Sequence, residues 1–175
     1  MGKRFKIFAA GLGLFGLAAA GTFYLLGPER VWRLAGDPDQ GSVDWDAIER
    51  SPNPNDALAC SVAACATPAE ITLPLYDATP EELLKEADEI IRGGTLSGNV
   101  QRVDDGQDPN AKRYVVRTPL MGYPDTLNLG VRAVEGRAGL LLYSRSLLGR
   151  SDLGANRRRI QKIIDALRPK SLPEA

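Results

Sequence analysis

The residues best suited to binding a ligand lie close together near the C-terminus of the 175-residue chain. They combine guanidinium, hydroxyl and amide groups, which are good hydrogen-bond partners for phosphate and carboxylate. A helix is expected to start within the same stretch, and the free N–H groups at a helix start attract anions. The sequence therefore predicts an anion or ligand site formed by Arg145, Arg150, Ser151, Asn156 and Arg157.

The same residues also allow a purely structural interpretation, which stays open at this point. In a helix, Asn156 and Arg157 lie one turn before Ile160, so both are expected on or beside its inward face. Polar groups that face inward need partners, because an unsatisfied group costs about 1–3 kcal/mol. In this interpretation Asp152 caps the helix and Asn156 ties down the preceding loop. Arg157 then pairs with an acid such as Asp125.

The chain contains no histidine, which limits the chemistry it can perform. Catalysis by Ser–His or Cys–His pairs is excluded, and the commonest metal ligand is missing. Acid–base chemistry by Asp, Glu, Lys or Tyr stays possible, but no catalytic residue, cofactor or metal site is predicted. Asp104, Asp105 and Asp108 weakly resemble a calcium loop. They lack the EF-hand pattern, so a solvated hairpin tip is the favoured interpretation.

Cys60 and Cys65 are the two cysteines of the chain. In an oxidising compartment they are expected to form a disulfide that pins an irregular segment to the edge of the domain. Free thiols and a redox-active pair are the alternatives. The spacing between the two residues is longer than the C-x-x-C of redox proteins, which favours a structural disulfide.

Residues 7–26 form an uncharged apolar run that follows Lys3, Arg4 and Lys6. An apolar helix of this length spans the hydrocarbon core of a bilayer, and the preceding positive charges favour a cytoplasmic N-terminus. We therefore expect a single-pass membrane anchor, with the rest of the chain outside the cytoplasm. A cleaved signal peptide that ends after Ala20 and a buried core helix are the alternatives.

The formal net charge is zero, but the charges are distributed unevenly. Residues 27–144 hold 11 basic and 19 acidic side chains, whereas residues 145–170 hold 8 basic and 2 acidic ones. The basic stretch lacks the interleaved aromatic residues of a nucleic-acid surface. Binding of nucleic acid is therefore not expected.

Hydrophobic periodicity predicts two helices, each with one apolar face. The first starts at a capping box of Thr79 and Glu82 and ends at two glycines, and the second runs from about Asp152 to Leu167. Strand-like runs between them are expected at residues 100–103, 113–118, 127–133 and 138–146. The predicted fold class is α+β: an antiparallel sheet of about four strands, with both helices packed on one face and a transmembrane helix before it.

The segment before the domain is rich in Pro, Gly, Asp and Asn, which predicts a spacer. Within it, Val43, Trp45 and Ile48 are expected to dock on the domain as a short apolar piece, with Trp45 as a buried anchor. The predicted boundaries are residues 1–26 for the anchor, 27–59 for the spacer, 60–170 for the domain and 171–175 for a flexible tail.

The stretch from Arg145 to Ile160 resembles the signature of a bacterial envelope family known as domain of unknown function 1499, whose motif is close to R-S-x-S-R-x-G-x-S-D-x-G-x-N-R-x-R-I. The matching positions are Arg145, Ser146, Gly149, Ser151, Asp152, Gly154, Asn156, Arg157, Arg159 and Ile160. Leu148 and Arg150 depart from the motif. Two other segments resemble the family: Tyr123-Pro124-Asp125, and Asn55 through Cys60 with Cys65. The resemblance implies an envelope domain and carries over no activity or catalytic residue.

The resemblance and the apolar N-terminus together imply a protein of the bacterial inner membrane whose domain lies in the periplasm. We expect a non-catalytic, membrane-tethered domain that binds a partner protein or an anionic small molecule or lipid. The alternatives are an envelope enzyme that uses Asp and Arg side chains, and a thiol–disulfide protein.

Overall fold

A computed structural model describes residues 18, 21–23 and 25–167 of the chain, which divides into two units, Met1–Gly36 and Asp37–Ala175. The described part of the first unit contains the short helix α2 (Pro28–Arg33). The fold prediction included a membrane-spanning helix, and this part is corrected: no helix among the described residues is long and apolar enough to cross a membrane. Most of the predicted anchor, residues 7–26, and the predicted tail lie outside the described residues.

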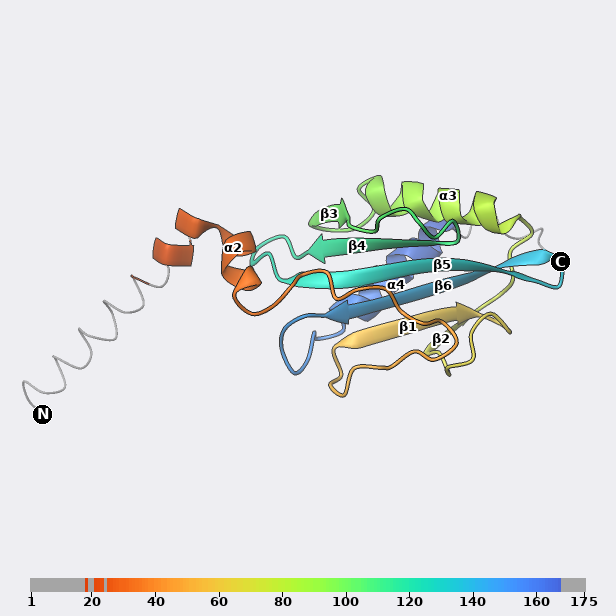
Figure 1. The fold of residues 1–175 in the computed structure, drawn as a ribbon, viewed down its shortest axis with the longest axis horizontal. Helices are drawn as coiled ribbons and strands as arrows, with labels where there is room; N and C mark the ends of the chain where they lie inside the picture. The colour runs from red at the N-terminus through yellow and green to blue at the C-terminus, as the bar shows by residue number, and fades with distance from the viewer. Residues whose placement is uncertain (1–17, 19–20, 24, 168–175) are drawn as a thin grey trace, which may run out of the picture. The chain divides into compact units, whose positions relative to one another are not determined.

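The second unit is an α+β domain built on one six-stranded sheet, shown in Figure 1. Its strands are β1 (Asp56–Ser61), β2 (Ile71–Leu73), β3 (Asn99–Arg102), β4 (Ala111–Arg117), β5 (Pro124–Val134) and β6 (Arg137–Ser146). They lie in the order β2-β1-β6-β5-β4-β3. β1 and β2 are parallel, and all other neighbouring pairs are antiparallel. The prediction of about four antiparallel strands is therefore wrong, because the sheet is mixed and has six strands.

The two strands that the sequence did not predict are β1 and β2. β1 lies inside the sheet between β2 and β6, and every residue after Asp56 is buried. A strand buried on both faces has no polar–apolar alternation by which it can be recognised. It also begins inside the Pro- and Asn-rich stretch predicted as a spacer. β2 has three residues, which is too short for a periodic pattern.

Cys60, near the end of β1, forms a disulfide with Cys65 in the turn that follows, as predicted. Both cysteines contact the apolar cluster on the face of the sheet away from the two main helices. The disulfide therefore ties the turn between β1 and β2 to this cluster.

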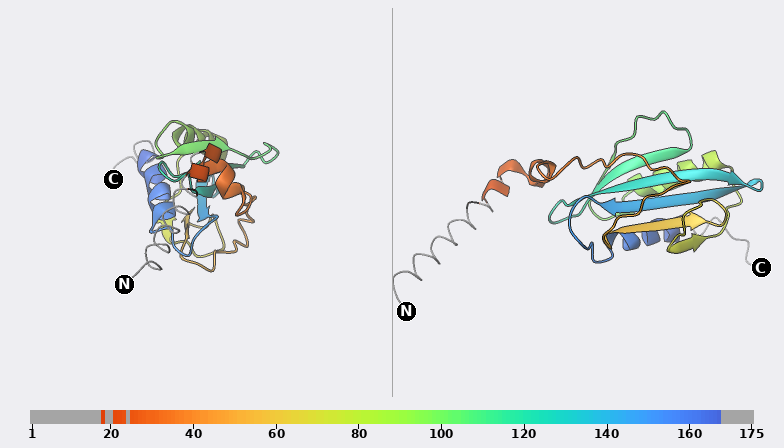
Figure 2. Two further views of the ribbon diagram at one scale, coloured as in Figure 1. Left: turned by 90° about the vertical axis from the view of Figure 1, so that its left-hand side faces the viewer. Right: turned by 60° about the horizontal axis from the view of Figure 1, so that its bottom comes forward.

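Helices α3 (Pro80–Arg92) and α4 (Ala155–Leu167) cover one face of the sheet (Figures 1 and 2). α3 begins at the predicted capping box, in which the Thr79 hydroxyl accepts from the Glu82 N–H and the Glu82 carboxylate accepts from the Thr79 N–H. Leu83, Leu84, Ala87 and Ile91 of α3 are buried against the sheet together with Ile160, Ile163, Ile164 and Leu167 of α4. Each helix therefore buries the apolar face that its periodicity predicts.

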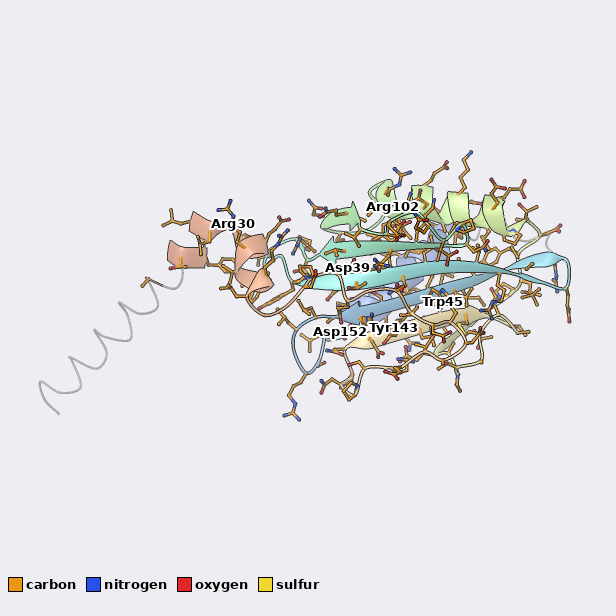
Figure 3. The ribbon with its side chains drawn as sticks, viewed as in Figure 1. Arg30, Asp39, Trp45, Arg102, Tyr143 and Asp152 are labelled. Atoms are coloured by element: carbon orange, nitrogen blue, oxygen red, sulfur yellow. A yellow bond between two sulfur atoms is a disulfide. The ribbon has the colours of Figure 1, made fainter. Side chains whose placement is uncertain are left out.

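The opposite face of the sheet is covered by residues 37–50, here called the strap. Ile48 is buried in a cluster that includes Tyr143, and Val43 and Trp45 pack against this cluster, which confirms the predicted docking piece. Trp45 is half-buried, so the buried anchor is Ile48 and not Trp45 as predicted. Figure 3 shows Trp45 and Tyr143 on this face. Gly130 of β5 makes room for the Trp45 indole, because a Cβ at this position would lie 2.7 Å from the ring.

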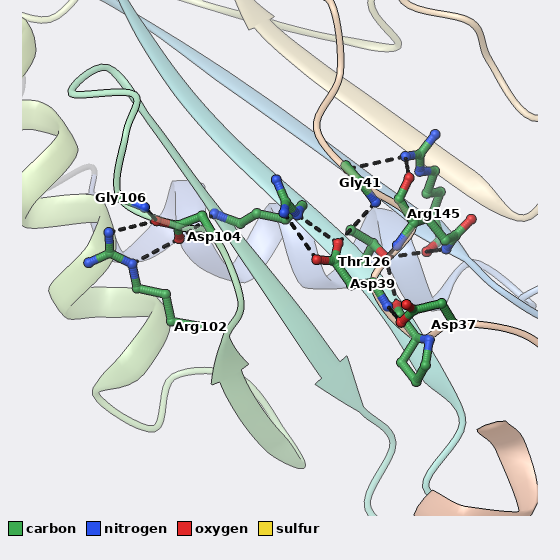
Figure 4. A network of polar contacts seen from close by, with 11 residues as sticks. Asp37, Asp39, Gly41, Arg102, Asp104, Gly106, Thr126 and Arg145 are labelled. Carbon is green, nitrogen blue, oxygen red and sulfur yellow. Dashed lines mark hydrogen bonds and ion pairs between the residues drawn. The ribbon is translucent and has the colours of Figure 1, made fainter.

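Polar contacts hold the start of the strap in place (Figure 4). The Arg113 guanidinium donates two hydrogen bonds to Asp39, at 2.6 and 3.0 Å. The Gln40 N–H donates to the Thr126 hydroxyl at 3.1 Å, and Arg145 donates to the Gln40 carbonyl at 2.6 Å. Three strands of the sheet therefore anchor this part of the strap.

A buried charge cluster joins α3 to the sheet. Asp88 of α3 is 4% exposed, and its carboxylate accepts hydrogen bonds from Tyr114 at 2.7 Å and from Lys112 and Arg92 at 3.0 Å. Burial favours the neutral carboxyl, but these three hydrogen bonds outweigh burial and lower the pKa of Asp88 below 3.8. Burial raises the pKa of Tyr114, and the bond to Asp88 raises it further, so the phenol stays protonated and donates.

Gly130→Ala is expected to push the Trp45 ring off its seat and lower the free energy of unfolding by about 1–3 kcal/mol. Urea unfolding followed by circular dichroism measures the change, because this signal does not depend on Trp45. Trp45→Ala removes the ring that the new methyl group meets, so Gly130→Ala should cost little more in that background. Equal costs of Gly130→Ala with and without Trp45 would contradict the proposed contact.

Asp88→Asn is expected to lower the free energy of unfolding at pH 7 by about 1–3 kcal/mol, because hydrogen bonds to a charged group are lost. The folded-state pKa of Asp88 is depressed, so its contribution is present above about pH 4 and disappears as the pH falls through the folded-state value. Urea unfolding at pH 7 and pH 3 should therefore show a smaller difference from the wild-type chain at pH 3. Glu89→Gln, on an exposed position of the same helix, is the control. A difference that does not change with pH would exclude this role of Asp88.

Candidate functional site

Four polar side chains meet between α4 and the sheet, where β5 begins and β6 ends. They are Asp125 of β5, Ser144 of β6, and Asn156 and Arg159 of α4, and none is more than 8% exposed. Asp125 and Ser146 are direct partners across β5 and β6. Polar groups at this depth need hydrogen-bond partners, because an unsatisfied buried group destabilises the fold.

Arg159 and Asp125 form a buried ion pair. The Arg159 Nη2 donates to the Asp125 Oδ2 at 2.6 Å, across a sequence separation of 34 residues. The Arg159 Nη1 donates to the Ser144 hydroxyl at 2.9 Å and also to the Asn156 side-chain oxygen. One guanidinium therefore joins α4 to both central strands.

Asn156 connects this ion pair to the loops. Its Oδ1 accepts from the Ser144 hydroxyl at 2.6 Å, and its Nδ2 donates to the Asn55 carbonyl and the Ser146 hydroxyl, each at 2.9 Å. The Asn55 Nδ2 in turn donates to the Gly149 carbonyl at 2.8 Å. These contacts agree with the structural interpretation of Asn156, although Asn156 reaches the loop before α4 through Asn55 and not directly.

Asp152 organises the start of α4, as its structural interpretation predicted. Its carboxylate accepts from the N–H groups of Gly154 at 2.8 Å and Asn156 at 2.7 Å. Figure 3 shows Asp152 in the loop that joins β6 to α4. Leu153, the next residue, has a φ of 52° and a side chain that is 84% exposed.

The five residues predicted for the anion site do not come together. Asn156 is buried in the ion-pair cluster, whereas Arg150, Ser151 and Arg157 are exposed. The predicted pairing of Arg157 with Asp125 is wrong, because Arg159 occupies that position. The inward face of α4 passes through residues 156, 159, 160, 163, 164 and 167, and Arg157 lies outside it.

Arg145 lies on the other face of the sheet. Alternation along β6 directs Ser144 and Ser146 toward α4 and Arg145 toward the strap, where its guanidinium lies 5.6 Å from the centre of the Tyr143 ring. The Tyr143 hydroxyl donates to Asp56 at 2.7 Å. Burial and this hydrogen bond raise the pKa of Tyr143 to about 12. The phenol is therefore neutral at physiological pH, and it contributes a hydrogen bond on the face of the sheet that the strap covers.

A pocket of about 330 Å³ opens beside the buried ion pair. Its lining residues are Leu96, Ser97, Thr118, Pro119, Ala155, Arg158, Arg159 and Lys162. Three of them are basic, two carry hydroxyl groups, and none of these described residues is acidic. Lys162 donates to the Ser97 hydroxyl at 3.0 Å, and Arg158 donates to the Leu153 carbonyl at 2.8 Å. The pocket therefore presents hydrogen-bond donors and positive charge at the N-terminal half of α4.

The sequence interpretation missed Arg158, Arg159 and Lys162. Arg159 lies four residues before Ile163, so the helical period alone places it on the inward face. Arg158 and Lys162 are also four residues apart and share the neighbouring strip of the helix. The distant residues of the pocket, Ser97 and Thr118, carry no sequence signal that connects them to α4.

The fold and the site define an α+β domain with a mixed sheet. A buried Asp–Arg ion pair fixes α4, whose N-terminal half is basic, to this sheet. The model of the family described as "Protein of unknown function (DUF1499)" matches residues 49–167, and the chain belongs to this family. The matched segment contains the whole sheet, α3 and α4, but only the last residues of the strap. No curated protein matches the chain.

Arg159→Met is expected to lower the free energy of unfolding by about 3–5 kcal/mol, because Asp125 is left as an unpaired buried charge. Arg157→Met changes the same residue type two positions earlier on an exposed site, and it should change the unfolding free energy by less than about 0.5 kcal/mol. Urea unfolding of both variants measures the contrast. Similar losses in the two variants would show that the ion pair does not carry this stability.

Proposed function

We propose that this protein is a non-catalytic binding domain whose pocket at the start of α4 takes an anionic ligand. The observation that carries the proposal is the lining of the pocket, with three basic and two hydroxyl side chains and no acidic one among the described residues. Arginine and lysine donors of this kind bind phosphate and carboxylate groups through charge-assisted hydrogen bonds.

The chemistry of the surrounding residues supports an anion as the ligand. Asp125 neutralises the charge of Arg159 from inside the domain. Arg159 therefore forms part of the pocket wall but adds little net charge to it. Arg158 and Lys162 are exposed and carry the net positive charge. Their present partners are a neutral carbonyl and a neutral hydroxyl, which an anion can replace without leaving a buried charge unpaired.

A domain outside the cytoplasm is part of the proposal. The Cys60–Cys65 disulfide supports it, because glutathione and thioredoxin keep most cytosolic thiols reduced. A binding role is favoured over an enzyme that uses Asp and Arg side chains, since the described lining of the pocket offers no carboxylate for proton transfer.

Titration of the full chain with inorganic phosphate by isothermal calorimetry tests the proposal. Arg158→Ala combined with Lys162→Ala is expected to weaken phosphate binding at least about tenfold, because two charge-assisted contacts are lost. The fold should survive, since both side chains are exposed.

Arg150→Ala combined with Arg157→Ala is the matched control, because it also removes two exposed positive charges and changes no residue that lines the pocket. The affinity of this control for phosphate should stay within about twofold of the wild-type value. Equal weakening in the control would indicate a diffuse charge effect. Unchanged binding in the Arg158 and Lys162 variant would rule out the pocket as the site.

A further inference from the structure

The exposed apolar residues of the second unit are concentrated at one end. Five large apolar side chains are exposed among the residues of this unit that the structure describes: Val62, Leu120, Met121, Tyr123 and Leu153. Four of them belong to two loops, residues 118–123 between β4 and β5 and residues 147–154 between β6 and α4. Leu120 is 87% exposed and Leu153 is 84% exposed. Large apolar side chains that gather at one site on a surface mark an interaction site.

These two loops are neighbours in space. β5 begins where β6 ends, and the Leu147 N–H donates to the Pro124 carbonyl at 3.3 Å. The views of Figures 1 and 2 both show the two loops at the same end of the sheet. The anion pocket opens beside the first loop, because Thr118 and Pro119 line it together with Ala155 and Arg158, which follow the second loop in α4.

Positive charge is concentrated on the second loop and the helix that follows it. Arg150, Arg157, Arg158 and Lys162 are exposed on the second loop and the first turns of α4. The two loops contain one acidic residue, Asp152, whose carboxylate is bonded to the N–H groups at the start of α4. The remainder of the domain is acidic, as residues 37–144 hold 18 acidic and 9 basic side chains. Such a separation of charge orients a protein toward a negative surface.

Leu153 is exposed by a backbone conformation that is unfavourable for leucine. A φ of 52° is unfavourable for a residue with a branched side chain, and glycine or asparagine is common at such positions. The Asp152 carboxylate and the Ser151 hydroxyl, which accepts from the Leu153 N–H at 3.2 Å, hold the turn in this shape. The turn thus points an apolar side chain outward beside the basic residues.

We propose that this end of the domain docks on an anionic lipid bilayer. Leu120 and Leu153 enter the interface between headgroups and acyl chains, and the pocket beside them takes the phosphate of a lipid headgroup. Apolar side chains next to basic ones bind membranes in this way, through buried apolar area and attraction to anionic lipids. The inference rests on the proposed function, because it assigns the anion of the pocket to a lipid.

Hydrogen–deuterium exchange of the full chain tests the docking, with vesicles of phosphatidylcholine that contain or lack phosphatidylglycerol. Exchange reports on the loops themselves, so any association of residues 1–36 with the vesicles does not obscure the result. Anionic vesicles are expected to slow exchange in residues 118–123 and 147–154 by at least about fivefold relative to neutral vesicles, roughly the effect of one basic residue near an anionic surface.

The variant Leu120→Ser combined with Leu153→Ser separates this inference from the proposed function. It should lose the vesicle-dependent protection and bind inorganic phosphate as the wild-type chain does. Val62→Ser, at the exposed apolar residue outside the two loops, is the matched control and should keep the protection.

Three outcomes would overturn docking on a lipid surface: no protection on anionic vesicles, equal protection on neutral ones, or full protection in the double leucine variant. If inorganic phosphate protects Ala155 to Lys162 while vesicles leave the loops unprotected, the ligand is a free anion. In that case the proposed function stands and the lipid assignment fails. If the wild-type chain does not bind inorganic phosphate, both the proposed function and the lipid assignment fail.

Discussion

The need to satisfy one buried guanidinium organises this domain. Arg159 lies under α4 with 8% of its surface exposed, where an unpaired charge would cost several kcal/mol. Asp125 supplies the opposite charge, and Ser144 and Asn156 accept the remaining donated hydrogen bonds. Because these partners come from β5, β6 and α4 itself, the helix can satisfy Arg159 in only one position on the sheet. Asn156 extends this network, because its side chain donates to the Asn55 carbonyl and to the hydroxyl of Ser146, the residue before the loop that leads into α4.

The pocket follows from this constraint. With Arg159 turned inward, its neighbours Arg158 and Lys162 take the adjacent strip of α4. They line the pocket together with residues of the loops that follow α3 and β4. The exposed basic side chains of Arg150, Arg157, Arg158 and Lys162 are thereby concentrated at one end of a domain whose remaining residues are mainly acidic. Leu120 lies in the loop whose residues Thr118 and Pro119 line the pocket, and Leu153 lies just before α4, whose basic residues line it. The charge and the apolar surface are therefore close to each other.

The other face of the sheet serves a different purpose. The strap covers it with Trp45, seated on Gly130, and with ion pairs from Arg113 to Asp39 and from Arg132 to Asp46. Arg145, a motif residue, belongs to this face, where it bonds to strap carbonyls and lies over Tyr143. The family motif therefore supports both faces of the sheet: its serine and asparagine side chains serve the helix face, and its first arginine serves the strap.

The sequence by itself determined the features that depend on neighbouring residues. The capping box of α3, the apolar faces of both helices, the Asp152 cap, the docking piece around Trp45 and the disulfide are local patterns, and each was predicted. Tertiary structure alone decided what depends on distant partners. β1 lacks alternation because it is buried on both faces, so its place in the sheet required its neighbours β2 and β6. Arg157 and Arg159 carry the same side chain in the same helix, and only the position of Asp125, 34 residues before Arg159, selected the one that is buried. The pocket likewise exists because folding brings Ser97 and Thr118 to α4, and no local interaction encodes that approach.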